Sequence, residues 1–126
     1  MAYRVSKSEF GRLVELAMQE LPEQFVEFLE EVPVEVRDRP SKKMLKDVGL
    51  GARDLLLGLY VGRPMTERSV EDSGRMPDVI YIFQEDVELA SGSEDELVEQ
   101  VRTTVLHEIG HHFGLSEDDL DELGYG

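Results

Sequence analysis

The residues best suited to chemistry in this chain lie in one short segment, His107-Glu108-Ile109-Gly110-His111. Residues four apart on a helix share a face, so the two imidazoles can bind one metal ion at about 2.0–2.1 Å. The glutamate is offset from the first histidine by about 100° and lies beside the metal, where it can act on a water molecule. The pattern predicts a zinc site with His107 and His111 as ligands and Glu108 as general base.

A helix that could position these side chains is predicted from Glu94 to about Phe113. Ser93 and Glu96 have the spacing of a capping box at its start. On a helical wheel the two zinc-binding histidines fall nearly opposite an apolar stripe. The stripe consists of Val98, Val101, Val105 and Ile109. Such a helix can pack its stripe on a core and turn its histidines toward a cleft.

The remaining residues of this segment have predicted structural roles. His112 falls beside the apolar stripe, which favours a hydrogen-bonded structural histidine, with a substrate-facing role as the alternative. Gly110 is expected to allow close packing against the helix. Gly114 is placed to take the left-handed conformation that ends a helix.

A third metal ligand has to come from elsewhere, because a catalytic zinc usually has three protein ligands and one open position. Since His112 points away from the other two histidines, a carboxylate must complete the site. The candidates are Glu117, Asp118, Asp119, Asp121 and Glu122. The alternative reading is that these acids complement the dipole at the start of a short C-terminal helix.

Length and composition predict one soluble domain over residues 1–126. Hydrophobic residues make up 40% of the chain and charged residues 33%, as in folded domains. There is no cysteine. A disulfide scaffold, a thiolate zinc site and a cysteine nucleophile are therefore excluded.

The spacing of apolar residues predicts an α+β fold, with a small mixed sheet packed on helices and the active-site helix near the C-terminus. Helices are expected over residues 7–20, 22–31 and 94–113, with a further short helix from Ser116. Strands are expected over residues 32–37, 55–61 and 79–83. Residues 41–53 are expected to form a basic loop with one helical turn, and residues 64–77 a polar loop.

The net charge of −15 is concentrated in the second half of the chain. Residues 64–126 carry 3 Lys+Arg and 17 Asp+Glu. This acidity argues against nucleic acid as a partner, because phosphate binding needs clustered cations. It indicates either simple solubility or a negative cleft that attracts metal ions and basic substrates.

A cytoplasmic protein without a membrane anchor is expected. The first ten residues lack the apolar region of a secretory signal. The longest apolar stretch, residues 55–61, is far too short to span a bilayer.

Three segments resemble the small bacterial zincin-like metallopeptidase family. They are HEIGHHFGLSEDDLDELGYG, LLGLYVGRPMTERS and PDVIYIF, and the resemblance runs from about residue 10 to the C-terminus. It implies a minimal zincin fold with zinc held by His107 and His111 and with Glu108 as general base. In zincins an extended peptide commonly lies along the edge strand of the sheet. The strand expected over residues 79–83 precedes the histidine helix and would take that role.

The stretch from His107 to Glu117 is also similar to the metzincin pattern H-E-x-x-H-x-x-G-x-x-H. Gly114 matches the glycine, and Glu117 stands where that pattern has its third histidine. The chain departs from metzincins in this replacement and in having no apparent methionine turn. The similarity predicts Glu117 as the third zinc ligand, with Asp121 on the same helical face as the alternative.

Together these features predict a metallopeptidase that holds one zinc ion per chain and hydrolyses a peptide or protein substrate. Two other classes fit the same residues. One is a zinc-binding domain whose peptidase activity is latent or lost and which serves as a binding module. The other is a hydrolase acting on a non-peptide amide. Glu108 favours catalysis, because a purely structural zinc needs no base beside it.

Overall fold

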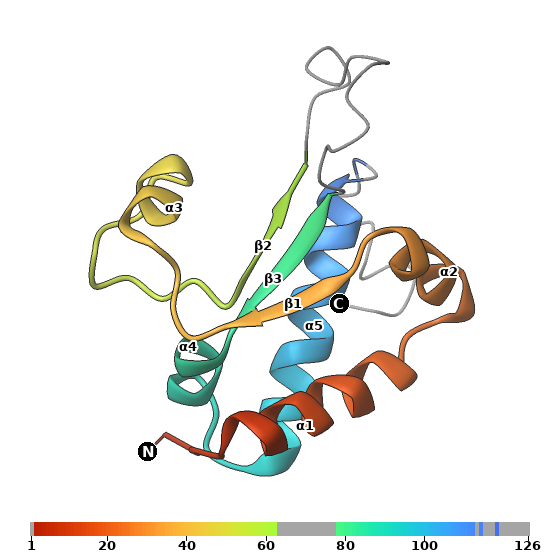
Figure 1. Cartoon of the computed structure of the whole chain (residues 1–126), viewed down its shortest axis with the longest axis horizontal. Helices are drawn as coiled ribbons and strands as arrows, with labels where there is room; N and C mark the ends of the chain where they lie inside the picture. Colours follow the sequence, from red (N-terminus) through yellow and green to blue (C-terminus); the bar gives the residue numbers. More distant parts are fainter. Residues whose placement is uncertain (1, 63–77, 113, 115–117, 119–126) are drawn as a thin grey trace.

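A three-stranded mixed sheet with helices around it forms the framework of the chain (Figure 1). The computed structural model describes residues 2–62, 78–112, 114 and 118. Its elements in chain order are α1 (Lys7–Gln19), α2 (Glu23–Glu31), β1 (Val34–Arg37), α3 (Lys42–Asp47), β2 (Gly58–Val61), β3 (Val79–Phe83), α4 (Gln84–Leu89) and α5 (Glu94–His112). The predicted α+β class is confirmed.

Most of the predicted elements are present, and the differences have local causes. The first two strands are shorter than expected, and α3 forms where one helical turn was predicted. Helix α4 was not predicted, because its buried residues include Gln84, Asp86 and Glu88. These polar residues interrupt the helical spacing of apolar residues on which the prediction depends. The loop expected over residues 64–77 lies outside the described residues. Within the described ranges, no helix is long and apolar enough to cross a membrane.

Strand β3 is the central strand of the sheet, in the order β1-β3-β2. It pairs in parallel with β1 and antiparallel with β2. The expectation that residues 79–83 form an edge strand is therefore wrong. Ile80, Ile82 and Phe83 are fully buried, in keeping with the central position of the strand. The edge strand that packs against α5 is β2.

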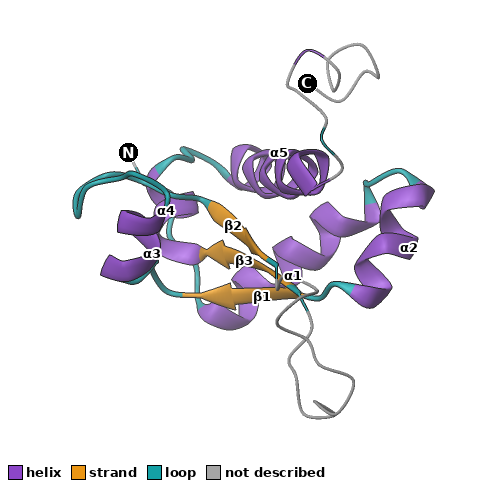
Figure 2. Cartoon of the chain, turned by 90° about the horizontal axis from the view of Figure 1, so that it is seen from above, coloured by secondary structure: helices purple, strands orange, loops and turns teal. Residues whose placement is uncertain are grey.

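One face of the sheet packs on α1 and α5. Ile80 and Ile82 alternate along β3 and join a single apolar cluster with residues of both helices. Helix α1 packs against α5, and α5 packs against β2 (Figure 2). The sheet and the two helices thus share one core, and the position of α5 is fixed from two sides.

Glycine at position 58 allows α5 to approach β2 closely. Gly58 is opposite Ile82 in the antiparallel register, so it belongs to the face that packs on the helices. A Cβ atom built on Gly58 would lie 2.5 Å from Cγ2 of Thr104 on α5 and 2.8 Å from the carbonyl oxygen of Tyr81. Both distances are shorter than a Cβ atom can approach another heavy atom. The carbonyl oxygen cannot move aside easily, because it belongs to the backbone of the central strand. Only glycine fits here without moving the helix.

A buried carboxylate fixes the segment that leads into β2. Asp86 on α4 is fully buried. Its Oδ2 accepts a hydrogen bond of 2.9 Å from the backbone N–H of Leu56, and its Oδ1 lies 3.4 Å from Nε of Arg39. One side chain therefore connects the chain after β1 to the chain before β2. This satisfies a backbone donor that would otherwise be costly to bury.

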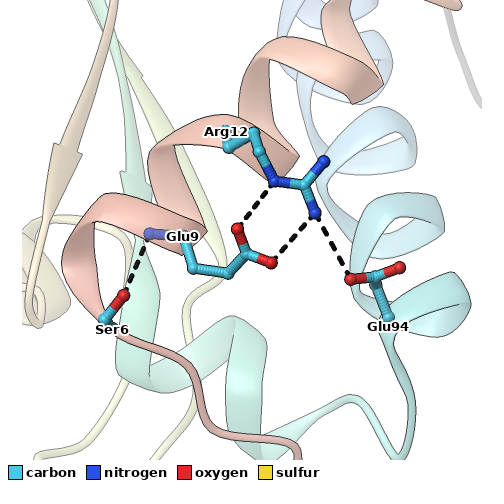
Figure 3. Close-up of polar contacts among 4 residues, drawn as sticks. All are labelled: Ser6, Glu9, Arg12 and Glu94. Carbon is cyan, nitrogen blue, oxygen red and sulfur yellow. Dashed lines mark hydrogen bonds and ion pairs between the residues drawn. The ribbon is translucent and has the colours of Figure 1, made fainter.

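The N-terminal part of α1 is linked to α5 by polar contacts at the surface (Figure 3). Ser6 caps α1 by accepting a 3.1 Å hydrogen bond from the N–H of Glu9. Arg12 binds the Glu9 carboxylate at 2.7 Å and reaches Glu94 of α5 at 3.5 Å. The hydrogen bond from Arg12 lowers the pKa of Glu9 below its ordinary value. Because these groups are exposed, the apolar contacts beneath them contribute more to the packing of α1 on α5.

The close approach at position 58 predicts that Gly58→Ala destabilises the protein. The added methyl must displace α5 or distort β3, at a cost of about 1–3 kcal/mol in the free energy of unfolding. Denaturant unfolding monitored by circular dichroism measures this change. The matched control is Gly11→Ala on α1, where a Cβ atom meets nothing within 4 Å. That variant is expected to gain about 0.5–1 kcal/mol from helix propensity. Equal stabilities of the two variants would contradict the packing described.

Candidate metal centre

Helix α5 carries the two predicted ligands His107 and His111 and the predicted base Glu108. Its start matches the predicted capping arrangement: Ser93 Oγ accepts from the N–H of Glu96 at 3.2 Å, and Glu96 accepts from the N–H of Gly92 at 3.2 Å. Its predicted apolar stripe is confirmed. Val101, Val105 and Ile109 are fully buried, and Val98 packs at the edge of the core.

The two predicted zinc ligands lie one turn apart on the last part of α5. His107 is half-buried, and the side chain of His111 is 60% exposed. Their neighbours Leu106 and Ile109 are fully buried. The helix thus turns its apolar residues inward and leaves at least one imidazole accessible to solvent. The side chain of His112, with its predicted structural role, lies outside the described part of the chain.

Glu108 is held between the helix and the edge of the sheet. Its side chain is 19% exposed. One carboxylate oxygen, Oε1, accepts a 2.8 Å hydrogen bond from the backbone N–H of Tyr60 in β2. The other oxygen, Oε2, lies 4.0 Å from Nδ1 of His111. The predicted base therefore has one oxygen bound by the sheet and the second on the side of the predicted ligands.

Tyr60 is a residue of this site that no sequence pattern indicates. Its ring stacks against Phe28 of α2, with centroids 6.4 Å apart. Its hydroxyl donates a 2.8 Å hydrogen bond to Oδ2 of Asp78. These contacts fasten β2 at the point where its backbone meets Glu108. No sequence signal could have revealed the contact, because it joins a backbone amide to a side chain 48 residues away.

The chain turns after α5 as predicted. Gly114 has a φ angle of 75°, and its N–H donates a 3.1 Å hydrogen bond to the carbonyl oxygen of His111. Asp118, beyond the turn, is helical and exposed. The predicted third ligand Glu117 and its alternative Asp121 lie outside the described residues.

The donor set on α5 fits part of what a zinc ion needs. Two imidazoles four residues apart with a carboxylate between them are a common zinc-binding arrangement. In the portion of the chain that the structure describes, no group of three or more His, Cys, Asp or Glu side chains could hold a metal ion. His107 and His111 are the candidate ligands among the described residues, and the predicted third ligand Glu117 lies outside these residues.

The chain belongs to the zincin-like metallopeptidase family, which its sequence matches over residues 29–126. The matched range includes β1, β2, β3 and α5, and so the strand contact to Glu108 as well as the histidines. It begins later than the resemblance expected from the sequence, which started near residue 10. Members of this family are named as metallopeptidases, which agrees with the donor set on α5.

A solved structure shares the fold. It is a conserved hypothetical protein from Thermo thermophilus, with a TM-score of 0.57 and 24% sequence identity. The alignment covers 86% of this chain and 94% of the other. At this identity the similarity concerns the fold alone. No curated protein matches the sequence.

The turn after His111 makes a specific prediction for Gly114. Its φ is in the left-handed region, and a Cβ atom there would meet nothing within 4 Å. Substitution is therefore costly only through backbone conformation. Gly114→Ala should reduce the free energy of unfolding by about 1 kcal/mol, and Gly114→Asn by less, because asparagine tolerates this conformation. Thermal unfolding of both variants measures the order of their stabilities. An alanine variant that is more stable than the asparagine variant would contradict the left-handed conformation at position 114.

Proposed function

We propose that this protein is a zinc-dependent metallopeptidase that hydrolyses peptide bonds. The observation that carries the proposal is the placement of Glu108 between the histidine face of α5 and the edge of the sheet. A carboxylate held there through one oxygen, with the other near His111, is suited to general-base catalysis. Membership of a metallopeptidase family supports the same chemistry.

In this proposal His107, His111 and Glu117 hold one zinc ion per chain, with Asp121 as the alternative third ligand. Zinc, when bound, supplies Lewis acidity toward a water molecule and toward the carbonyl of the substrate. The protein contributes two imidazoles on one helical face, and α5 keeps them in register through its buried stripe. The fourth position would remain open for the reaction.

Glu108 transfers a proton from the attacking water to the leaving amine. Its Oε2 accepts a proton as a water oxygen attacks the carbonyl carbon of the peptide bond. The same carboxyl then donates this proton to the amide nitrogen as the carbon–nitrogen bond breaks, which releases an amine and a carboxylic acid. Oε1 remains bound to the N–H of Tyr60 throughout, so the carboxylate keeps its orientation in both steps.

The substrate strand is assigned to β2 in place of β3. An extended peptide can add to a sheet only at an edge, and β3 is paired on both sides. Of the two edge strands, β2 is the one that contacts α5 and Glu108. Since Glu108 occupies the N–H of Tyr60, a bound peptide would pair with the other outward-facing groups of β2.

The first test separates metal binding from hydrolysis. Glu108→Gln keeps an oxygen that can accept from Tyr60 but removes the base. It should retain about one zinc per chain and lose about 10²–10⁴-fold in kcat. His107→Ala should lose both zinc and activity. Elemental analysis of the purified variants and a digest of a peptide library measure the two quantities.

The same experiment distinguishes the alternative function. A zinc-binding domain that serves only as a binding module would hold zinc in the wild type and cleave no peptide in the library. Cleavage of simple amides but not of peptides would instead indicate the non-peptide hydrolase. Hydrolysis that survives in Glu108→Gln would contradict the role of Glu108.

The third ligand is tested by zinc affinity at fixed pH. Removing a true ligand should weaken zinc binding severely, whereas removing an acid that only complements a helix dipole should cost about 0.3–1 kcal/mol of stability. Glu117→Ala is therefore expected to bind zinc poorly, with the exposed Asp118 providing the control as Asp118→Ala. Wild-type affinity in Glu117→Ala together with a loss in Asp121→Ala would transfer the role to Asp121.

The charge of the chain predicts a preference for cationic peptides. Residues 64–126 carry 17 acidic and 3 basic side chains, and α5 lies within this half. Two peptides that differ only by lysine or glutamine beside the cleavage site should differ in kcat/KM at low salt. The difference should shrink toward 1 M salt, where charges are screened within about 3 Å. Equal rates at low salt would refute the charge preference.

A further inference from the structure

One hydrogen bond connects the predicted base to the sheet, and its geometry goes beyond the assignment of Glu108 itself. The donor is a backbone N–H, that of Tyr60, and the acceptor is Oε1 of Glu108 at 2.8 Å. A backbone donor has no side-chain rotamers, so its direction is set by the strand. The contact therefore fixes Glu108 relative to the sheet more firmly than a flexible side-chain donor would.

This N–H faces away from the rest of the sheet. In an antiparallel pair, residues alternate between those bonded to the partner strand and those directed outward. Leu57 is bonded to the partner strand, since its carbonyl accepts from the N–H of Phe83 at 2.9 Å. By alternation, Leu59 also bonds to β3, and Gly58 and Tyr60 direct their backbone groups outward. The Tyr60 amide is thus directed to Glu108 and not to the ladder.

The two carboxylate oxygens consequently have different surroundings. Oε1 is held by the strand, while Oε2 is 4.0 Å from Nδ1 of His111. Without the strand contact, the side chain of Glu108 could sample several rotamers. With it, Oε2 is kept on the side of the helix where His111 lies.

We propose that the backbone N–H of Tyr60 is a positioning group for the general base. It binds Oε1 of Glu108 so that Oε2 alone is presented to the reacting water. This inference rests on the proposed peptidase function for its catalytic consequence. The contact joins two groups of the chain itself, so it can be tested separately from activity.

The side chain of Tyr60 has a different role, which the experiment must separate. The ring stacks on Phe28, and the hydroxyl donates to Asp78. Both contacts hold β2 in place but neither touches Glu108. Tyr60→Ala, which removes the ring and keeps the N–H, is therefore the control for Tyr60→Pro, which removes both.

The first arm of the experiment measures the contact by amide hydrogen exchange in metal-free protein. In Glu108→Ala the Tyr60 amide should exchange about ten- to a hundredfold faster than in wild type, as expected for loss of a hydrogen bond to a charged group. In Glu108→Gln it should stay largely protected. The amide of Phe83, bonded to Leu57 in the same sheet, is the reference and should be unchanged. An unchanged Tyr60 amide in Glu108→Ala would overturn the proposal.

The second arm compares Tyr60→Ala with Tyr60→Pro. Both lose the ring, and only proline loses the N–H. Proline is tolerated on an edge strand where the N–H faces outward, so the ladder to β3 should survive. The proline variant should bind zinc and substrate like the alanine variant but show a kcat about ten- to a hundredfold lower, with KM unchanged. Equal kcat values would overturn the positioning role, and a higher kcat in the proline variant would identify the contact as inhibitory instead.

The exchange and kinetic measurements distinguish failure of the peptidase function from failure of the positioning role. If wild-type protein hydrolyses no peptide, the peptidase function fails, while hydrogen exchange still decides whether Tyr60 holds Glu108. If Tyr60→Pro does not fold, the exchange arm alone decides the contact. If exchange shows the contact and kcat is the same in both Tyr60 variants, the hydrogen bond is structural and the positioning role is wrong.

Discussion

The close packing of α5 against β2 is the constraint on which the rest of the site depends. Gly58 lets the helix approach until a Cβ atom would overlap Thr104. At that separation the backbone of Tyr60, two residues along the strand, comes within hydrogen-bond reach of Glu108. The buried stripe of α5 sets the rotation of the helix about its axis, so that His111 is accessible while Ile109 is in the core. Distance and rotation together determine where the predicted base lies.

Buried polar groups in the fold serve two distinct purposes. Asp86 and Glu88 on α4 are buried and accept from the backbone N–H groups of Leu56 and Val5, so they join distant segments of chain. Glu108 also accepts from a backbone N–H but remains 19% exposed, with its second oxygen directed toward the histidine side. The buried, hydrogen-bonded carboxylates of Asp86 and Glu88 serve to stabilise the fold. The arrangement of Glu108 leaves its Oε2 available for chemistry.

Features that depend on neighbouring residues could be predicted from the sequence. The extent of α5, its capping residues, its apolar stripe and the left-handed Gly114 all follow from local spacing and conformational preference. Features that depend on tertiary pairing could not. The central position of β3 is set by which strands pair with it, and the contact from Tyr60 joins segments 48 residues apart. Helix α4 escaped prediction because Asp86 and Glu88 face the interior, contrary to the usual pattern.

In the proposed site, α5 presents two histidines to one zinc ion while the sheet holds Glu108 out of the coordination sphere. The most direct measurement is a crystal structure of the zinc-loaded protein with anomalous diffraction at the zinc edge. One peak per chain is expected, at about 2.0–2.1 Å from a ring nitrogen of both His107 and His111. Glu108 is expected to remain bound to the N–H of Tyr60 and not to ligate the metal. A peak away from the two histidines, or a Glu108 oxygen bonded to zinc, would contradict this arrangement of the site.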